Sequence, residues 1–447
     1  MHIKTRFAVV VWLLALHLVA CGVPPATLEQ VSPSDTPVKL PATAIPSHTP
    51  PPTELPTNPP PTTVPVATEI PTETVAPPVP PPGPTLERLP AGQELVFTRL
   101  YMIDQLSGWA TGGVAGSNDH LFTTSNGGST WRDITPPQPG EPGTLAVAAF
   151  FQDDSTAWAT YYGESMDILF PSWPVVWRTT DAGSTWQPSQ PLDLTGLEFT
   201  YQTELVFADF QHGWLLTHVG AGMSHDYVTI YQTTDGGFTW ARLLDPYNDV
   251  QIQGCSKTGL TFLDSQVGWL TGDCNGVMAG AFLNRTTDGG TTWSYIDLPA
   301  PADQPTLFDV DTWAACGTYD LHFFDAQTAL LGVRCTQYAQ DSSDPTHSYY
   351  LYTTQDGGVT WSSKPYPAGT LLFVDPLNGW ALSRDIYRTA DGGLTWTLAN
   401  TVHWDARFNF ITPQVGWAAS YTETEYALVG TTDGGAHWAM LEPRVAP

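Results

Sequence analysis

An eight-residue phrase recurs seven times in this chain, and it constrains the possible fold more than any other feature. Each copy has the form Thr-x-Asp-Gly-Gly-x-Thr-Trp or departs from it at a single position. The third position holds Asn126, Asp181, Asp235, Asp288, Asp356, Asp391 and Asp433, and the last holds Trp131, Trp186, Trp240, Trp293, Trp361, Trp396 and Trp438. Self-similarity at a period near 50 residues indicates a propeller or a solenoid.

A second phrase, loosely Phe-x-Asp-x-x-x-Gly-Trp, precedes each copy of the first. Five copies keep both the Asp and the Trp of this phrase: Asp104 and Trp109, Asp153 and Trp158, Asp209 and Trp214, Asp264 and Trp269, and Asp375 and Trp380. The fifth copy along the chain has Leu330 in place of Trp, and the seventh has Thr412 in place of Asp. Seven copies within residues 91–447 leave 51 residues per unit, a length that suits four short strands and their turns.

The chemistry of both phrases predicts two hairpins per unit. The first phrase matches the Asp-box (BNR) motif, in which glycine permits a tight turn and the Asp carboxylate accepts N–H groups of that turn. In the second phrase an apolar strand ends at Asp and a new one starts at Gly-Trp. Because Trp buries a large area, the Trp residues at equivalent positions predict a core between blades. We therefore expect an all-β fold, a seven-bladed β-propeller of four-stranded antiparallel blades over residues 91–447.

The N-terminus predicts export and a lipid anchor. Residues 1–20 combine a basic start, Lys4 and Arg6, with an apolar run too short to span a bilayer, as in a signal peptide. Leu18-Val19-Ala20-Cys21 resembles the lipobox of bacterial lipoproteins, which implies lipidation of Cys21 and anchoring in the cell envelope, facing the periplasm or the cell surface. The alternative is a soluble secreted protein with an ordinary cleavage site.

Residues 21–90 form the predicted linker behind the lipidated Cys21. From Gly22 to Pro90, 22 of 69 residues are Pro and 12 are Thr, and Phe, Trp and Tyr are absent. Such a segment has no apolar surface to offset the entropy of ordering, so we expect a disordered Pro/Thr-rich tether. At about 3.1 Å per residue, its upper reach is roughly 210 Å. A Pro-rich recognition segment is the alternative.

Four cysteines remain after Cys21, and they occupy matching positions in two adjacent units. Cys255 and Cys316 lie 14 residues before the Trp269 and Leu330 positions, and Cys274 and Cys335 lie 5 residues after them. An even count in an exported protein favours disulfides. Of three possible connectivities we expect Cys255 with Cys274 and Cys316 with Cys335, each closing one hairpin. A metal site is the alternative.

The remaining composition excludes several function classes. With 44 acidic and 16 basic residues, the net charge of -28 argues against a nucleic-acid partner. The 11 His are scattered, and we find no nucleotide-binding loop, catalytic serine motif or EF-hand loop. We therefore predict no catalytic residues, no metal and no cofactor.

Non-repeated insertions carry the predicted binding face. The second unit adds aromatic residues that include Tyr161 and Trp173, and the fifth adds a segment that includes Tyr349. Loops on a rigid scaffold vary freely, and exposed aromatic residues suit a protein partner or sugar rings. Packing of these side chains against the adjoining blade is the alternative.

The doubled repeat resembles the photosystem II assembly and stability factor family of seven-bladed propellers. The resemblance implies a non-enzymatic factor that binds a membrane or envelope protein. We expect the chain to be a monomer. Arg178, Arg285 and Arg388 share one position and could line a face, or they could be solvated strand residues. Asp boxes are also similar to those of sialidases and other glycoside hydrolases, so a glycan-active enzyme or a glycan-binding module is the alternative function.

Overall fold

The structure is a computed structural model that describes residues 78–447, apart from 82, 115–116, 164–169, 223–224, 250–251, 275–278, 313 and 338–343. The predicted signal peptide, Cys21 and the linker as far as residue 77 lie outside the described residues. In the described part of the chain, no helix is long and apolar enough to cross a membrane.

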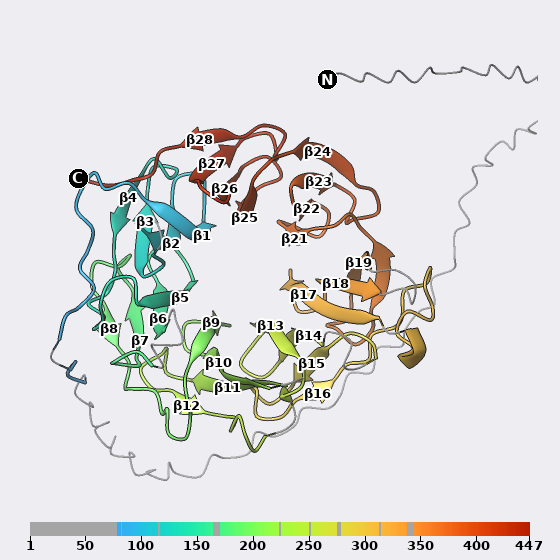
Figure 1. The fold of residues 1–447 in the computed structure, drawn as a ribbon, viewed down its shortest axis with the longest axis horizontal. Helices are drawn as coiled ribbons and strands as arrows, with labels where there is room; N and C mark the ends of the chain where they lie inside the picture. Colours follow the sequence, from blue (N-terminus) through green and yellow to red (C-terminus); the bar gives the residue numbers. More distant parts are fainter. Residues whose placement is uncertain are drawn as a thin grey trace, which may run out of the picture. The chain divides into compact units, whose positions relative to one another are not determined.

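Over the described residues, seven antiparallel units of four consecutive strands are arranged in a ring (Figure 1). The inner strands are β1 (Val96–Met102), β5 (Leu145–Phe151), β9 (Tyr201–Phe207), β13 (Ser256–Phe262), β17 (Ala315–Phe323), β21 (Thr370–Phe373) and β25 (Asp405–Phe410). The second strands are β2 (Gly108–Gly113), β6 (Ala157–Gly163), β10 (Gly213–Gly222), β14 (Gly268–Asp273), β18 (Ala329–Gln337), β22 (Gly379–Leu382) and β26 (Gly416–Tyr421). The predicted all-β propeller is confirmed.

The outer half of each blade is a second hairpin. The third strands are β3 (His120–Thr124), β7 (Val176–Thr179), β11 (His225–Thr233), β15 (Leu283–Thr286), β19 (Thr346–Thr354), β23 (Asp385–Thr389) and β27 (Tyr426–Thr431). The outer strands are β4 (Thr130–Asp133), β8 (Gln187–Pro188), β12 (Ala241–Arg242), β16 (Ser294–Tyr295), β20 (Ser362–Pro365), β24 (Thr397–Thr401) and β28 (Ala439–Leu441). A short 3-10 helix, η2 (Val310–Thr312), lies between the fourth and fifth blades.

Each Asp box closes the turn between the third and outer strands. In the fifth blade, Asp356 accepts hydrogen bonds from the Thr360 N–H at 2.9 Å and from the Thr354 hydroxyl at 2.8 Å. The Thr360 hydroxyl donates to the other carboxylate oxygen at 2.6 Å, and these bonds lower the pKa of Asp356 to about 2. Gly357 and Gly358 have φ values of 69° and 83°, which glycine adopts without strain. The carboxylate is therefore occupied within its own turn.

The second phrase closes the turn between the inner and second strands. Asp209 accepts the N–H groups of Gln211 and His212, both at 2.7 Å. In the seventh blade the Thr412 hydroxyl accepts the Val415 N–H at 3.0 Å. A hydroxyl thus takes the place of the carboxylate where the sequence departs from the phrase.

The Trp residues of the second phrase join neighbouring blades. Trp214 stacks on Phe262 of the next blade with ring centroids 3.5 Å apart, and its indole N–H donates to the Gly289 carbonyl at 2.8 Å. Trp158 and Trp380 make the same stack and the same kind of hydrogen bond. The core therefore lies between blades, as predicted, rather than in one central cluster.

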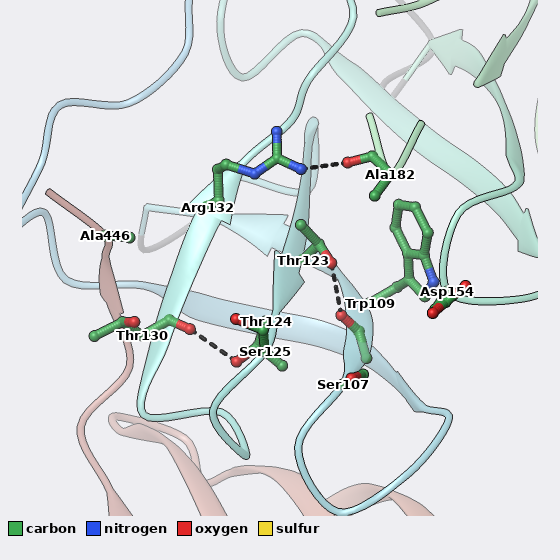
Figure 2. Close-up of a pocket in the computed structure, with 11 residues that line it drawn as sticks. Ser107, Trp109, Thr123, Thr124, Ser125, Thr130, Arg132, Asp154, Ala182 and Ala446 are labelled. Carbon is green, nitrogen blue, oxygen red and sulfur yellow. Dashed lines mark hydrogen bonds between the residues drawn. The ribbon is translucent and has the colours of Figure 1, made fainter. Parts of the chain in front are cut away.

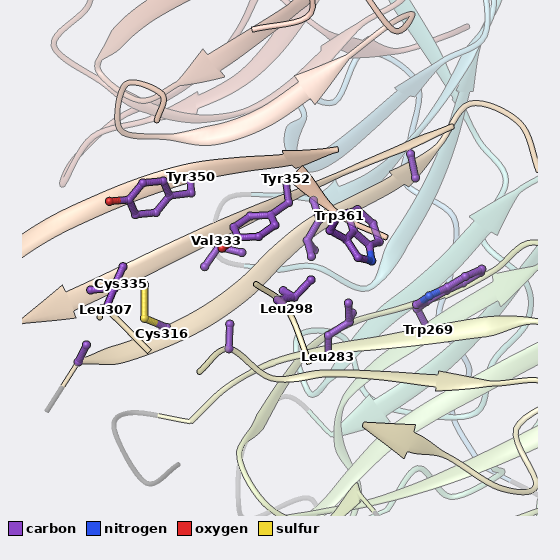
Figure 3. Close-up of a cluster of buried hydrophobic side chains, with 14 residues drawn as sticks. Trp269, Leu283, Leu298, Leu307, Cys316, Val333, Cys335, Tyr350, Tyr352 and Trp361 are labelled. Carbon is purple, nitrogen blue, oxygen red and sulfur yellow. A yellow bond between two sulfur atoms is a disulfide. The ribbon is translucent and has the colours of Figure 1, made fainter. Parts of the chain in front are cut away.

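The contact between the fourth and fifth blades includes a disulfide (Figure 3). Trp269, Leu283, Tyr352 and Trp361 are buried together there. Cys316 and Cys335 face one another across β17 and β18 at the end of this cluster, and the corresponding bond in the fourth blade joins Cys255 and Cys274. The predicted connectivity is confirmed.

The ring closes without exchange of a strand between blades, a point that the sequence leaves open. The C-terminal segment adds β29 (Arg444–Val445) as a fifth, parallel strand on β4 of the first blade. The Trp417 indole donates to the Gly127 carbonyl at 3.3 Å, and Asn409 accepts the Met102 N–H at 2.8 Å. Side-chain packing and the added strand together hold the first and seventh blades.

The predicted linker boundary at residue 90 is too late by several residues. Leu86 is buried in the core between the first and second blades. The Leu89 N–H donates to Asp133 at 2.8 Å, and Arg88 donates to the Gly183 carbonyl at 3.2 Å. The buried Leu86 side chain and these two hydrogen bonds attach residues 86–89 to the propeller, although the segment contains no aromatic residue.

Candidate functional site

The two ends of the ring differ in kind. Both turn types described above lie at one end, the Asp-box face, because the inner and third strands of a blade run in the same direction. The opposite end, which we call the loop face, carries the connections between second and third strands and the links between blades. The described parts of the non-repeated segments, including residues 170–175, 189–200 and 296–312, lie at the loop face. Variable recognition groups are therefore concentrated there.

The structure corrects two of the three residues predicted for the binding face. Tyr161 is 4% exposed and Trp173 is 6% exposed, and both belong to the core between the first two blades. The Trp173 ring meets Trp177 edge-to-face at 5.5 Å, and its carbonyl accepts the Gln138 side-chain amide at 3.1 Å. The insertion folds back on the adjoining blade because its aromatic rings gain more by burial than by exposure.

Tyr349, the third predicted residue, lies in a polar cluster between the fourth and fifth blades. Arg334 on β18 lies directly opposite Tyr349 on β19 in the sheet. The Arg334 guanidinium donates hydrogen bonds to the Tyr319 hydroxyl at 2.8 Å and to Asp273 at 3.3 Å. The Tyr319 hydroxyl donates to Asp273, and burial together with this bond raises the pKa of Tyr319. We call Asp273, Tyr319, Arg334 and Tyr349 the tyrosine–arginine cluster.

This cluster is both exposed and rigidly held. The Arg334 side chain is 47% exposed, and its guanidinium lies 4.9 Å from the centre of the Tyr319 ring. Tyr349 is half-buried and packs edge-to-face on Tyr366 at 5.8 Å. The Cys316–Cys335 bond clamps the two strands that carry Tyr319 and Arg334. The sequence offers only the spacing of the cysteines as a signal for this arrangement.

A cavity of about 610 Å³, which we call the channel cavity, lies on the inner side of the ring. Its walls come from inner strands β1, β5, β9 and β25, and the charged residues that line it are Arg99, Glu204 and Arg407. Glu204 accepts the Leu260 N–H of the next blade at 3.0 Å. Burial raises the pKa of Glu204 to about 7, although the charge of Arg99 and the Leu260 bond oppose the shift. The Glu204 carboxyl group that lines this cavity is therefore partly protonated near neutral pH.

Asp320 has a similar position on the fifth blade. It accepts the Leu371 N–H of the sixth blade at 2.9 Å, and burial raises its pKa to about 6. Glu204 and Asp320 thus both link neighbouring inner strands. Neither residue stands out in the sequence, because a single acid within an apolar strand resembles an ordinary polar alternation.

A second pocket of about 400 Å³ lies between the first two blades (Figure 2). Trp109, Thr123 and Asp154 line it, and the Arg132 guanidinium crosses it to donate to the Ala182 carbonyl. Thr123 is the cross-strand partner of Trp109 in the first blade. In the second blade, Arg178 is the corresponding partner of Trp158. The smaller side chain leaves this space open.

Arg178, Arg285 and Arg388 do not line a common binding face. Their guanidinium carbons lie 5.8, 5.4 and 5.9 Å from the rings of Trp158, Trp269 and Trp380. Arg388 also donates to the carbonyls of Asp433 and Pro413, at 3.0 and 2.8 Å. All three are half-buried, so they belong to the contacts between blades. Over the residues that the structure describes, no group of three His, Cys, Asp or Glu is placed to hold a metal ion.

Comparisons with known proteins concern the fold alone. No family model and no curated protein sequence matches the chain. Among solved structures, YCF48 bound to a D1 peptide is 16% identical with a TM-score of 0.45, over 83% of this chain and 98% of that one. An α-L-arabinanase of Penicillium chrysogenum, complexed with arabinobiose, is 10% identical with a TM-score of 0.43, over 77% and 99%. A GH74 enzyme of Niastella koreensis is 15% identical with a TM-score of 0.33, over 78% and 62%. Likenesses at this level carry no information about activity or partners.

Proposed function

We propose that this chain is an exported, lipid-anchored scaffold that binds a protein partner through its loop face and catalyses no reaction. The tyrosine–arginine cluster carries this proposal. Arg and Tyr are enriched at the centres of protein interfaces, where they contribute much of the binding free energy. Because a disulfide and hydrogen bonds already hold Tyr319 and Arg334 in place, binding costs little further side-chain entropy.

The Asp boxes fit a structural role better than a catalytic one. Every Asp-box carboxylate or amide is engaged by the hydroxyl and N–H groups of its own turn, as in Asp356. A catalytic acid pair occurs once in a protein, whereas this residue is repeated in each blade. The rigid ring then presents the loop face to a partner, and the linker would hold it away from the membrane.

Variants of the cluster test the proposal. Crosslinking and affinity purification from native membranes would compare the wild type with Arg334→Ala and Tyr349→Ala. The control is Arg384→Ala, because Arg384 is an exposed arginine in an ion pair with Asp405 at 2.8 Å. We expect the wild type and the control to recover the same partner, and both cluster variants to lose it. Equal recovery by all four proteins would refute a role for the cluster.

A glycan-active enzyme is the second candidate, and Glu204 favours it. A carboxyl group with a pKa near neutrality in a cavity of ligand size is a common feature of a general acid. Its hydrogen bond to Leu260 also explains it as a link between blades. A panel of aryl glycosides tests this candidate. Turnover by the wild type that disappears in Glu204→Gln would support a glycan-active enzyme. Absence of turnover by the wild type would exclude it for these substrates and favour the scaffold.

A further inference from the structure

Two arginines occupy one register position on neighbouring inner strands. Arg99 lies three residues before Met102 on β1, and Arg407 lies three residues before Phe410 on β25. Met102 and Phe410 each pair with the glycine that begins the second strand of their blade. Both line the channel cavity. The charge of Arg99 acts on Arg407, and burial together with this repulsion lowers the pKa of Arg407.

Two acids at the same register position of other inner strands form hydrogen bonds to the next blade, whereas the two arginines do not. Glu204 and Asp320 accept N–H groups of the following blade, at 3.0 and 2.9 Å. Within the described part of the chain, Arg99 and Arg407 make no hydrogen bond and no ion pair. Both arginine side chains are exposed to solvent and repel one another, so their N–H donors are accessible and a bound anion would reduce the repulsion.

The cavity is positive within an acidic protein. The whole chain has a net charge of -28, yet the charged residues that line the cavity are two arginines and Glu204. Burial raises the pKa of Glu204 to about 7, so its carboxyl group is partly protonated near neutral pH and carries less than a full negative charge. This local field attracts an anion that the rest of the surface repels.

We propose that the channel cavity binds a small organic carboxylate between Arg99 and Arg407. Planar guanidinium groups bind carboxylates through paired, charge-assisted hydrogen bonds. The volume of about 610 Å³ is within the usual range for small-molecule sites, and Thr98, Gln202 and Tyr162 supply neutral polar groups around it. Val147 and Leu205 also line the cavity, and they would pack on the carbon skeleton of an organic carboxylate, which inorganic phosphate lacks. The inference does not depend on the function proposed for the loop face.

Ligand titration of the full chain tests the inference. Succinate and inorganic phosphate are the probes, and thermal unfolding and calorimetry are the readouts for the wild type, Arg99→Gln and Arg407→Gln. Arg384→Gln is the control, since it removes an arginine outside the cavity. We expect succinate to stabilise the wild type and the control, and to bind each cavity variant about tenfold more weakly or worse. Phosphate should bind more weakly than succinate.

The unliganded variants separate a binding role from a structural one. Removal of either arginine relieves the repulsion, so Arg99→Gln and Arg407→Gln should unfold at the same temperature as the wild type or above it. A lower unfolding temperature for both variants would mean that the arginines stabilise the fold, and it would overturn the inference. Absence of succinate binding by the wild type, unchanged binding by both variants, or phosphate binding as tight as succinate would also overturn it.

Discussion

Replacement of Trp214 with Phe should lower the free energy of unfolding by about 1–3 kcal/mol more than replacement of Trp269 with Phe. The two residues hold equivalent positions in adjacent blades, and they are 0% and 1% exposed. Each packs on a Phe of the next blade, with ring centroids 3.5 and 4.3 Å apart. They differ at the indole nitrogen: Trp214 donates to the Gly289 carbonyl at 2.8 Å, whereas Trp269 has no acceptor among the described residues.

The magnitude follows from this difference. Both changes remove the same part of a buried ring, so most of the packing cost cancels when the variants are compared. Only Trp214→Phe breaks a buried hydrogen bond and deprives the Gly289 carbonyl of its donor, at a cost of about 1–3 kcal/mol. The Arg285 guanidinium lies 5.4 Å from the Trp269 ring, and its weaker attraction to Phe offsets roughly 0.5 kcal/mol of the difference.

Urea unfolding followed by far-ultraviolet circular dichroism measures both variants against the wild type. The reasoning requires a larger fall in the midpoint for Trp214→Phe at an unchanged slope. A Trp269→Phe variant that is destabilised as much as Trp214→Phe would show that the indole hydrogen bond does not contribute to the contact between blades.

Three further predictions concern the disulfides, Glu204 and the anchor. Replacement of Cys316 and Cys335 with Ser should destabilise the protein by about 3 kcal/mol, because the disulfide closes a loop with a sequence separation of 19. Thermal unfolding measures this loss, and an unchanged unfolding temperature would show that the backbone hydrogen bonds between the two strands are sufficient. Because the folded pKa of Glu204 is raised from 4.5 to about 7, its contribution to stability is complete below pH about 4.5 and is lost as the pH rises towards 7. The unfolding temperature of the wild type should therefore fall relative to Glu204→Gln across this range, and parallel pH profiles would contradict the shift. Cys21→Ser should abolish incorporation of labelled fatty acid and release the protein from membranes, whereas an unlabelled wild type would exclude the predicted anchor.

The repeated residues made the fold predictable, and the residues that occur once did not reveal the site. Each Asp box forms its hydrogen bonds within a few residues, so its turn can be inferred without knowledge of the rest of the chain. The disulfides could be inferred because Cys255 and Cys316 share one position of the repeat. Exposure of Tyr161 and Trp173 could not be judged in this way, since it depends on how an insertion folds against the neighbouring blade.

The sequence by itself determined the number of blades, the hairpins within them and the pairing of the cysteines, because these features rest on local contacts that recur at a regular spacing. Only the tertiary structure decided how the ring closes, which insertions are buried, and which side chains meet across the channel cavity. Arg99 and Arg407 are 308 residues apart in the chain, and they face one cavity only because the seventh blade returns to the first. Such a meeting depends on the geometry of the whole ring, which no local pattern encodes.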